Sequence, residues 1–199
     1  MKIINKSTLG FILMIVALSS LFTNTLFALS IGPEAYRTGA PGDKGTCKDS
    51  DCHDSNALNS GSAKFSITGP ASYTPGKTIK LKVSFDSSSG KLHGFEMTAI
   101  DADDNQIGKF KAIGKTTQVI KPNGFRGLKK EDKGTYIEHT SSGNKKKNWI
   151  VKWIALAKDT GTVTFYAAGN DANGDGTNSG DYIYTTTLEI AAESSASGQ

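Results

Sequence analysis

Several features are scarce or absent in this chain, and each absence excludes a class of protein. After residue 30, no window sustains the apolar period of an amphipathic helix, which excludes a helical fold. No Gly-x-Ser-x-Gly occurs and no acid pair can be singled out, so we expect a protein that is not an enzyme. Lys2 and Lys6 carry two of the four net positive charges. The rest is close to balanced, which gives no reason to expect a nucleic-acid partner.

Residues 1–28 are predicted to be a secretory signal peptide. Two lysines precede the apolar run from Leu9 to Phe22, and Ala28 is the expected residue before the cut. A run of about 14 residues is shorter than the roughly 20 that cross a bilayer, so we expect cleavage rather than a retained membrane anchor. The mature protein, without a transmembrane segment, is expected in the periplasm, on the cell surface or outside the cell.

Strand patterns dominate the rest of the chain. Ile79–Phe85 alternates strictly between apolar and polar residues, and Trp149–Leu156 is apolar on both faces except at Lys152, which predicts a central strand. About seven to nine short strands separated by turn residues are typical of a sandwich. We therefore predict an all-β fold, an Ig-like antiparallel β-sandwich over residues 63–191.

The flanking segments have a different composition. Residues 29–62 are rich in Gly, Ser, Asp and Asn, and are predicted to form an irregular segment that packs across the sandwich. The polar tail, residues 192–199, is predicted to be disordered. Two basic runs, Lys129–Lys130 and Lys145–Lys147, lie in polar stretches and are expected to be solvated loops.

The segment Cys47-Lys-Asp-Ser-Asp-Cys52-His53 contains both cysteines of the chain. A c-type haem is usually attached through two cysteines separated by two residues and followed by histidine; here the spacer is four residues long. Cys47 and Cys52 would then be the haem thioethers, and His53 an axial ligand. The alternative is a Cys47–Cys52 disulfide, because thiols do not stay free in an oxidising compartment. Spacing alone favours the disulfide.

A haem held by His53 needs a sixth ligand, a water or an open position. The other two histidines are His93, near the start of a predicted strand, and His139, in a short segment among loops. No standard zinc spacing is present, and a copper or zinc site on His53 and His139 is a weaker hypothesis.

The stretch 171–181 opens with Asp171-Ala-Asn-Gly-Asp-Gly176, which matches the start of a calcium-binding loop. The closing glutamate is absent, since Tyr182 occupies position twelve. Strands rather than helices are expected on both sides. Two interpretations stay open: a calcium site, or a hairpin loop rich in Asn, Asp and Gly.

Further blocks support a family resemblance. Gly39–Cys47 leading into Cys52-His53, and then Tyr73–Gly76, resembles the opening of the bacterial choice-of-anchor V domains. Gly94–Ala99, Tyr136–Thr140 and Val163–Asn170 resemble later blocks of that family. These domains are similar to Reeler domains, which are extracellular β-sandwiches. The resemblance covers residues 37–190.

The resemblance implies a function. Cys47 and Cys52 would bind one haem c, with His53 as the proximal and His139 as the distal iron ligand. The chain would then be an exported cytochrome-like protein that transfers electrons to a partner protein or senses redox state. The alternative is a Reeler-like extracellular binding or adhesion module with a Cys47–Cys52 disulfide and no cofactor.

Overall fold

The computed structural model describes residues 31–48 and 52–193, which form ten β-strands and no α-helix. No helix in these ranges is long and apolar enough to cross a membrane. The predicted signal peptide and all but the first two residues of the predicted tail lie outside the described residues. The strands are β1 (Lys64–Thr68), β2 (Ser72–Tyr73), β3 (Thr78–Asp86), β4 (Leu92–Ile100), β5 (Lys109–Lys111), β6 (Thr117–Val119), β7 (Ile137–His139), β8 (Asn148–Ile154), β9 (Val163–Ala172) and β10 (Tyr182–Ala192).

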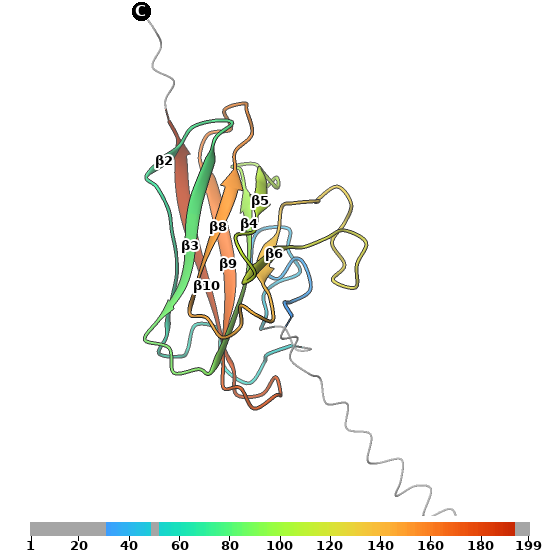
Figure 1. Cartoon of the computed structure of the whole chain (residues 1–199), viewed down its shortest axis with the longest axis vertical. Coiled ribbons are helices and arrows are strands. Elements are labelled where there is room, and N and C mark those ends of the chain that lie inside the picture. The colour runs from blue at the N-terminus through green and yellow to red at the C-terminus, as the bar shows by residue number, and fades with distance from the viewer. Residues whose placement is uncertain (1–30, 49–51, 194–199) are drawn as a thin grey trace, which may run out of the picture.

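The strands form two packed sheets, which confirms the predicted β-sandwich (Figure 1). The four-stranded sheet has the order β1-β3-β8-β5, and the six-stranded sheet has the order β2-β10-β9-β4-β7-β6. Neighbouring strands are antiparallel except β2, which runs parallel to β10. The strand predicted to be central is β8, which lies between β3 and β5.

Aromatic side chains fill the space between the two sheets. Trp149 and Trp153 of β8 are fully buried, and Phe95 and Phe165 reach them from the opposite sheet. Each indole N–H donates a hydrogen bond to a backbone carbonyl, at 3.1 Å, so the core contains no unpaired indole.

The outer faces of the two sheets are covered differently. On the four-stranded sheet Lys80 and Lys82 of β3 reach solvent, and Ile150 of β8 is 40% exposed. On the six-stranded sheet β4 is buried on both faces beyond Leu92. Glu96 and Thr98 are therefore buried, although their alternation with apolar residues is typical of a strand with a solvent-exposed face.

The irregular N-terminal segment provides this cover, as predicted. The backbone N–H groups of Tyr36 and Arg37 donate to the two carboxylate oxygens of Glu96, at 3.1 and 3.0 Å. Tyr36 also packs edge-on against Tyr136, in a small second core with Ile120 and Leu128. The segment that contains the cysteine motif is thus bound to the outer face of the six-stranded sheet.

Candidate functional site

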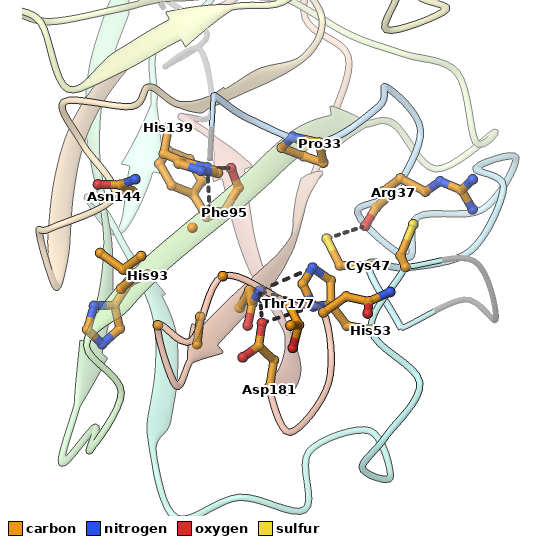
Figure 2. A pocket seen from close by; sticks show the side chains of 18 of the residues that line it. Pro33, Arg37, Cys47, His53, His93, Phe95, His139, Asn144, Thr177 and Asp181 are labelled. Atoms are coloured by element: carbon orange, nitrogen blue, oxygen red, sulfur yellow. Dashed lines mark hydrogen bonds and ion pairs between the residues drawn. The ribbon is translucent and has the colours of Figure 1, made fainter. Parts of the chain in front are cut away.

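A cavity of about 580 Å³ lies between the N-terminal segment, the start of β4 and the loop that joins β9 to β10. Both cysteines and all three histidines of the chain line it (Figure 2). The four residues predicted for haem binding, which are up to 92 positions apart in the sequence, therefore meet at one site. The remaining lining residues are Pro33, Glu34, Arg37, Leu92, Gly94, Phe95, Asn144, Asn170, Ala172, Gly174, Gly176, Thr177, Asn178 and Asp181.

The two ends of the cysteine motif are held together by the backbone. The N–H of His53 donates to the carbonyl of Cys47 at 3.2 Å. Cys47 is buried against Ala168 and Ile183, and its Sγ lies 3.9 Å from the carbonyl oxygen of Arg37. Cys52 is half-buried. Residues 49–51 lie outside the described residues.

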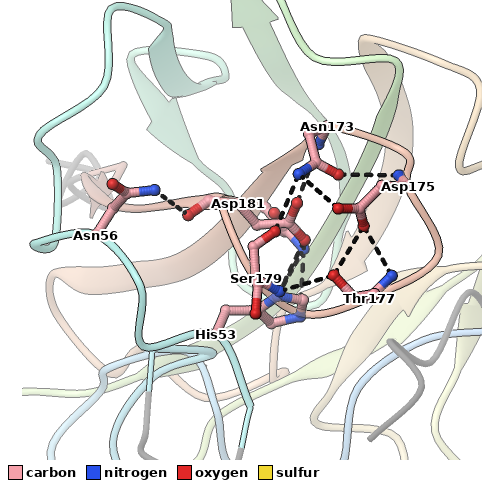
Figure 3. Close-up of polar contacts among 8 residues, drawn as sticks. His53, Asn56, Asn173, Asp175, Thr177, Ser179 and Asp181 are labelled. Atoms are coloured by element: carbon pink, nitrogen blue, oxygen red, sulfur yellow. Dashed lines mark hydrogen bonds and ion pairs between the residues drawn. The ribbon is translucent and has the colours of Figure 1, made fainter. Parts of the chain in front are cut away.

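His53 is oriented by a buried aspartate directly before β10 (Figure 3). Its Nδ1 lies 3.0 Å from Oδ2 of Asp181, whose side chain is 1% exposed. Asp181 also accepts hydrogen bonds from the Asn170 amide, at 3.1 Å, and from the Asn173 backbone, at 3.0 Å. A carboxylate on Nδ1 holds the proton there and leaves the lone pair of Nε2 for a metal, as in many histidine metal sites. The Asn170 amide nitrogen lies 3.3 Å from Nε2.

His139 ends β7 and lies against the first residues of β4. Its Nδ1 is 3.1 Å from the nitrogen and 3.2 Å from the oxygen of Phe95. Its Nε2 makes no hydrogen bond within the described part of the chain. The ring fits because Gly94 has no side chain: a Cβ there would lie 2.5 Å from Cε1 of His139.

Burial also sets the protonation of His139. Burial lowers the pKa of His139 to about 4, and the hydrogen bond with Phe95 only partly offsets this effect. The imidazole is therefore neutral at neutral pH. A neutral imidazole whose Nδ1–H donates to the Phe95 carbonyl has its Nε2 lone pair available for a metal, whereas the Phe95 N–H donating to Nδ1 corresponds to the form with the proton on Nε2.

His93, the third histidine, is engaged elsewhere. Its Nε2 lies 2.5 Å from Oγ of Ser88 and 3.1 Å from Oδ1 of Asp171. Figure 2 shows its ring at the opposite end of the site from His53. Burial raises the pKa of Asp171, but the hydrogen bonds from His93 and Ser88 outweigh it, and the net shift is downward. His93 therefore belongs to a structural contact between β4 and β9.

The predicted calcium loop is held together by its own hydrogen bonds (Figure 3). Asp175 accepts from the backbone and hydroxyl of Thr177, both at 2.8 Å, and Asn173 accepts from the Asp175 backbone at 2.9 Å. The two end residues, Asp171 and Asp181, contact His93 and His53 instead. Within residues 31–48 and 52–193, no group of three or more His, Cys, Asp and Glu side chains is arranged around a metal position. Calcium binding here stays a prediction.

Comparison with known families agrees with this architecture. The Reeler domain family model matches residues 45–169, well over half of the chain. The chain belongs to the Reeler domain family. No curated protein matches it. The matched region of this Reeler domain includes the cysteine motif, His139 and most of β9, and it ends before Asp181.

The cavity in this Reeler domain has a mixed polar and apolar lining. Two thiols and two imidazoles surround a cavity that Leu92, Phe95 and Pro33 line with apolar surface. Such a mixture of apolar walls and a few placed polar groups is typical of cofactor sites. Gly94 supplies the close approach that a Cβ would block. Sequence reasoning missed Asp181 as a support of His53, because the pairing of β9 with β10 brings them together.

Proposed function

We propose that this Reeler domain is an exported protein that binds one haem c covalently and transfers or senses electrons. The observation that supports it is that Cys47, Cys52, His53 and His139 line one cavity, with both imidazoles held through Nδ1. A disulfide would use the two thiols, but it gives no reason for two oriented histidines beside them.

Each residue would have a distinct role. The thiols of Cys47 and Cys52 would form the thioether bonds, and Nε2 of His53 and of His139 would bind the iron from its two faces. When bound, haem c accepts and releases one electron at its iron. Arg37 is the only lysine or arginine among the lining residues, so it would balance a haem carboxylate.

The supporting residues would tune the iron ligands. Asp181 accepts the Nδ1 proton of His53 and so makes this imidazole a more electron-rich ligand. The backbone of Phe95 is a neutral partner and fixes the His139 ring without adding charge. The N-terminal segment and the β9–β10 loop would limit the access of water, because both contribute walls to the cavity.

The test is expression with export and the haem-maturation machinery, followed by absorption spectra of the oxidised and reduced protein. The proposal predicts a Soret band and sharp α and β bands on reduction. Pyridine haemochrome spectra should show two thioether linkages in the wild type. The Cys47→Ala and Cys52→Ala variants should each show one linkage or lose the haem.

Two histidine variants separate ligation from folding. His139→Ala should lose the six-coordinate low-spin spectrum while keeping covalent haem. His93→Ala, a matched change on the same cavity, should keep the low-spin spectrum because His93 is paired with Ser88 and Asp171. A colourless wild-type protein with a Cys47–Cys52 disulfide would contradict the proposal and favour the binding or adhesion module.

A further inference from the structure

A basic loop with one exposed aromatic ring, residues 121–134, projects from the sandwich between β6 and β7 (Figure 1). We call it the Phe125 loop. Phe125 is 70% exposed, more than any other large apolar side chain in the described part of the chain. Four lysines of the loop are exposed, against one exposed acidic residue, Glu131. The exposed lysines are Lys121, Lys129, Lys130 and Lys133.

The loop is anchored, so this exposure is a fixed property of the fold. Ile120 and Leu128 are buried on either side of Phe125 in the small core with Tyr36 and Tyr136. The N–H of Asn123 donates to the carbonyl of Leu128 at 3.2 Å and closes the tip. Leu128 thus turns inward while Phe125, three positions earlier, stays in water.

Arg126 joins Phe125 to the N-terminal end of the described chain. Its guanidinium lies 5.3 Å from the centroid of the Phe125 ring, donates to the carbonyl of Ile31 at 2.5 Å, and forms an ion pair with the buried Glu138. Ile31 is itself 42% exposed.

We propose that the Phe125 loop docks on the surface of an anionic lipid membrane, with the Phe125 ring inserted below the headgroups. Lysines around one apolar anchor are attracted to anionic headgroups, and an aromatic ring is favourable at the membrane interface. A protein partner would need a broader patch with several anchors near its centre. The Phe125 loop offers a single exposed ring surrounded by lysines.

Vesicle sedimentation of the exported protein tests the proposal. Vesicles containing phosphatidylglycerol should sediment the protein at low salt, and pure phosphatidylcholine vesicles should sediment much less. Phe125→Ser should weaken binding on the order of tenfold, through the loss of one buried aromatic side chain. Leu156→Ser, which removes another exposed apolar side chain, should leave binding unchanged.

Two double variants distinguish the charge of the Phe125 loop from the net charge of the protein. Lys130→Glu combined with Lys133→Glu should weaken binding to the anionic vesicles by on the order of a hundredfold. Lys145→Glu combined with Lys146→Glu makes the same change in net charge on another exposed loop and should have a much smaller effect.

A fluorescent variant reports insertion directly. Phe125→Trp should shift its emission to shorter wavelength and be quenched by brominated lipids when anionic vesicles are added, whereas Leu156→Trp should not respond. Equal weakening by both lysine pairs, or an unresponsive Trp at position 125, would overturn the proposal. Binding to polyglutamate without any response to vesicles would also overturn it and indicate an acidic protein partner instead.

Discussion

The outer faces of the two sheets differ in what covers them. On the four-stranded sheet, Lys80 and Lys82 of β3 and Ile150 of β8 are exposed to solvent. On the six-stranded sheet, Glu96 of β4 and Glu138 of β7 pair directly across the strands, and both are fully buried. Polar side chains on the outer face of the four-stranded sheet can hydrogen-bond to water. Buried polar side chains on the outer face of the six-stranded sheet require hydrogen-bond partners from the protein.

The covering groups come from the N-terminal segment and the Phe125 loop. Tyr36 and Arg37 donate their backbone N–H groups to Glu96, and Arg126 pairs with Glu138. The same N-terminal segment places Cys47 and His53 in the wall of the cavity. Comparison of the two sheets therefore indicates that the buried carboxylates of β4 and β7 hold in place the segment that contains the candidate site.

The largest expected effect is a contrast between Glu96→Gln and Lys82→Gln. Both oxygens of Glu96 accept backbone N–H groups, so a glutamine amide would direct a donor at another donor. We expect a loss of about 3 kcal/mol in the free energy of unfolding. Lys82 is exposed, and its substitution should stay within about 0.5 kcal/mol. Urea unfolding of both variants measures the contrast; equal effects would mean that the cover does not depend on Glu96.

The second prediction concerns pH and the haem-free protein. The pKa of His139 is about 4 in the fold, below its ordinary value of 6.5, because burial disfavours the charged form. Stability is therefore full above about pH 6.5 and falls as the pH drops toward 4, by about 2 to 3 kcal/mol. Unfolding free energies across this range should show the decline. His139→Gln should flatten it, and Lys152→Gln on the other sheet should leave it unchanged.

The third prediction compares two aspartates of the β9–β10 hairpin. Asp181→Asn should raise the reduction potential of the haem protein by on the order of 50 mV. A carboxylate accepts the Nδ1 proton of His53 more strongly than an amide does, so the wild-type imidazole is the more electron-rich ligand and stabilises the oxidised iron. Asp175→Asn changes an exposed residue of the same loop and should not shift the potential. Equal potentials for Asp181→Asn and the wild type would show that Asp181 does not tune the iron ligand.

The smallest effect is expected for the same substitution on the two sheets. The hydroxyl of Thr98 hydrogen-bonds Gln106 at 2.8 Å and the carbonyl of Thr135 at 2.9 Å. Thr98→Val should cost about 1 to 2 kcal/mol, since it leaves those acceptors without a donor. Thr78 is exposed at the start of β3 in the four-stranded sheet, and Thr78→Val should change the free energy of unfolding by no more than about 0.5 kcal/mol. Thermal unfolding of the pair measures the difference.

Much of the fold could be predicted from the sequence because long alternating strands report their own burial. Ile79–Phe85 was recognisable for this reason, as β3 confirms. Trp149–Leu156 was recognised by its nearly continuous apolar run, and it forms the central strand β8, although Ile150 on its outer face is exposed. The three-residue strands β5, β6 and β7 are too short to carry a period, and no strand was predicted for them. The buried outer face of β4 depends on a segment 60 positions away, which local pattern does not report.

The candidate site was partly predictable. The cysteine motif identified Cys47, Cys52 and His53, and the family resemblance added His139. Asp181 was assigned only to a possible calcium loop, because its contact with His53 depends on the turn between β9 and β10. Gly94 likewise has meaning only once the His139 ring lies against it. Such contacts require the tertiary fold.

The most direct test of the central claim is the intact mass of the exported protein after denaturation, together with its absorption spectrum. Covalent haem predicts a mass increase of one haem over the mature chain, with a Soret band that survives acid–acetone extraction. A colourless chain, lighter than the reduced mature chain by the hydrogen atoms lost on forming a disulfide, would contradict haem attachment at Cys47 and Cys52.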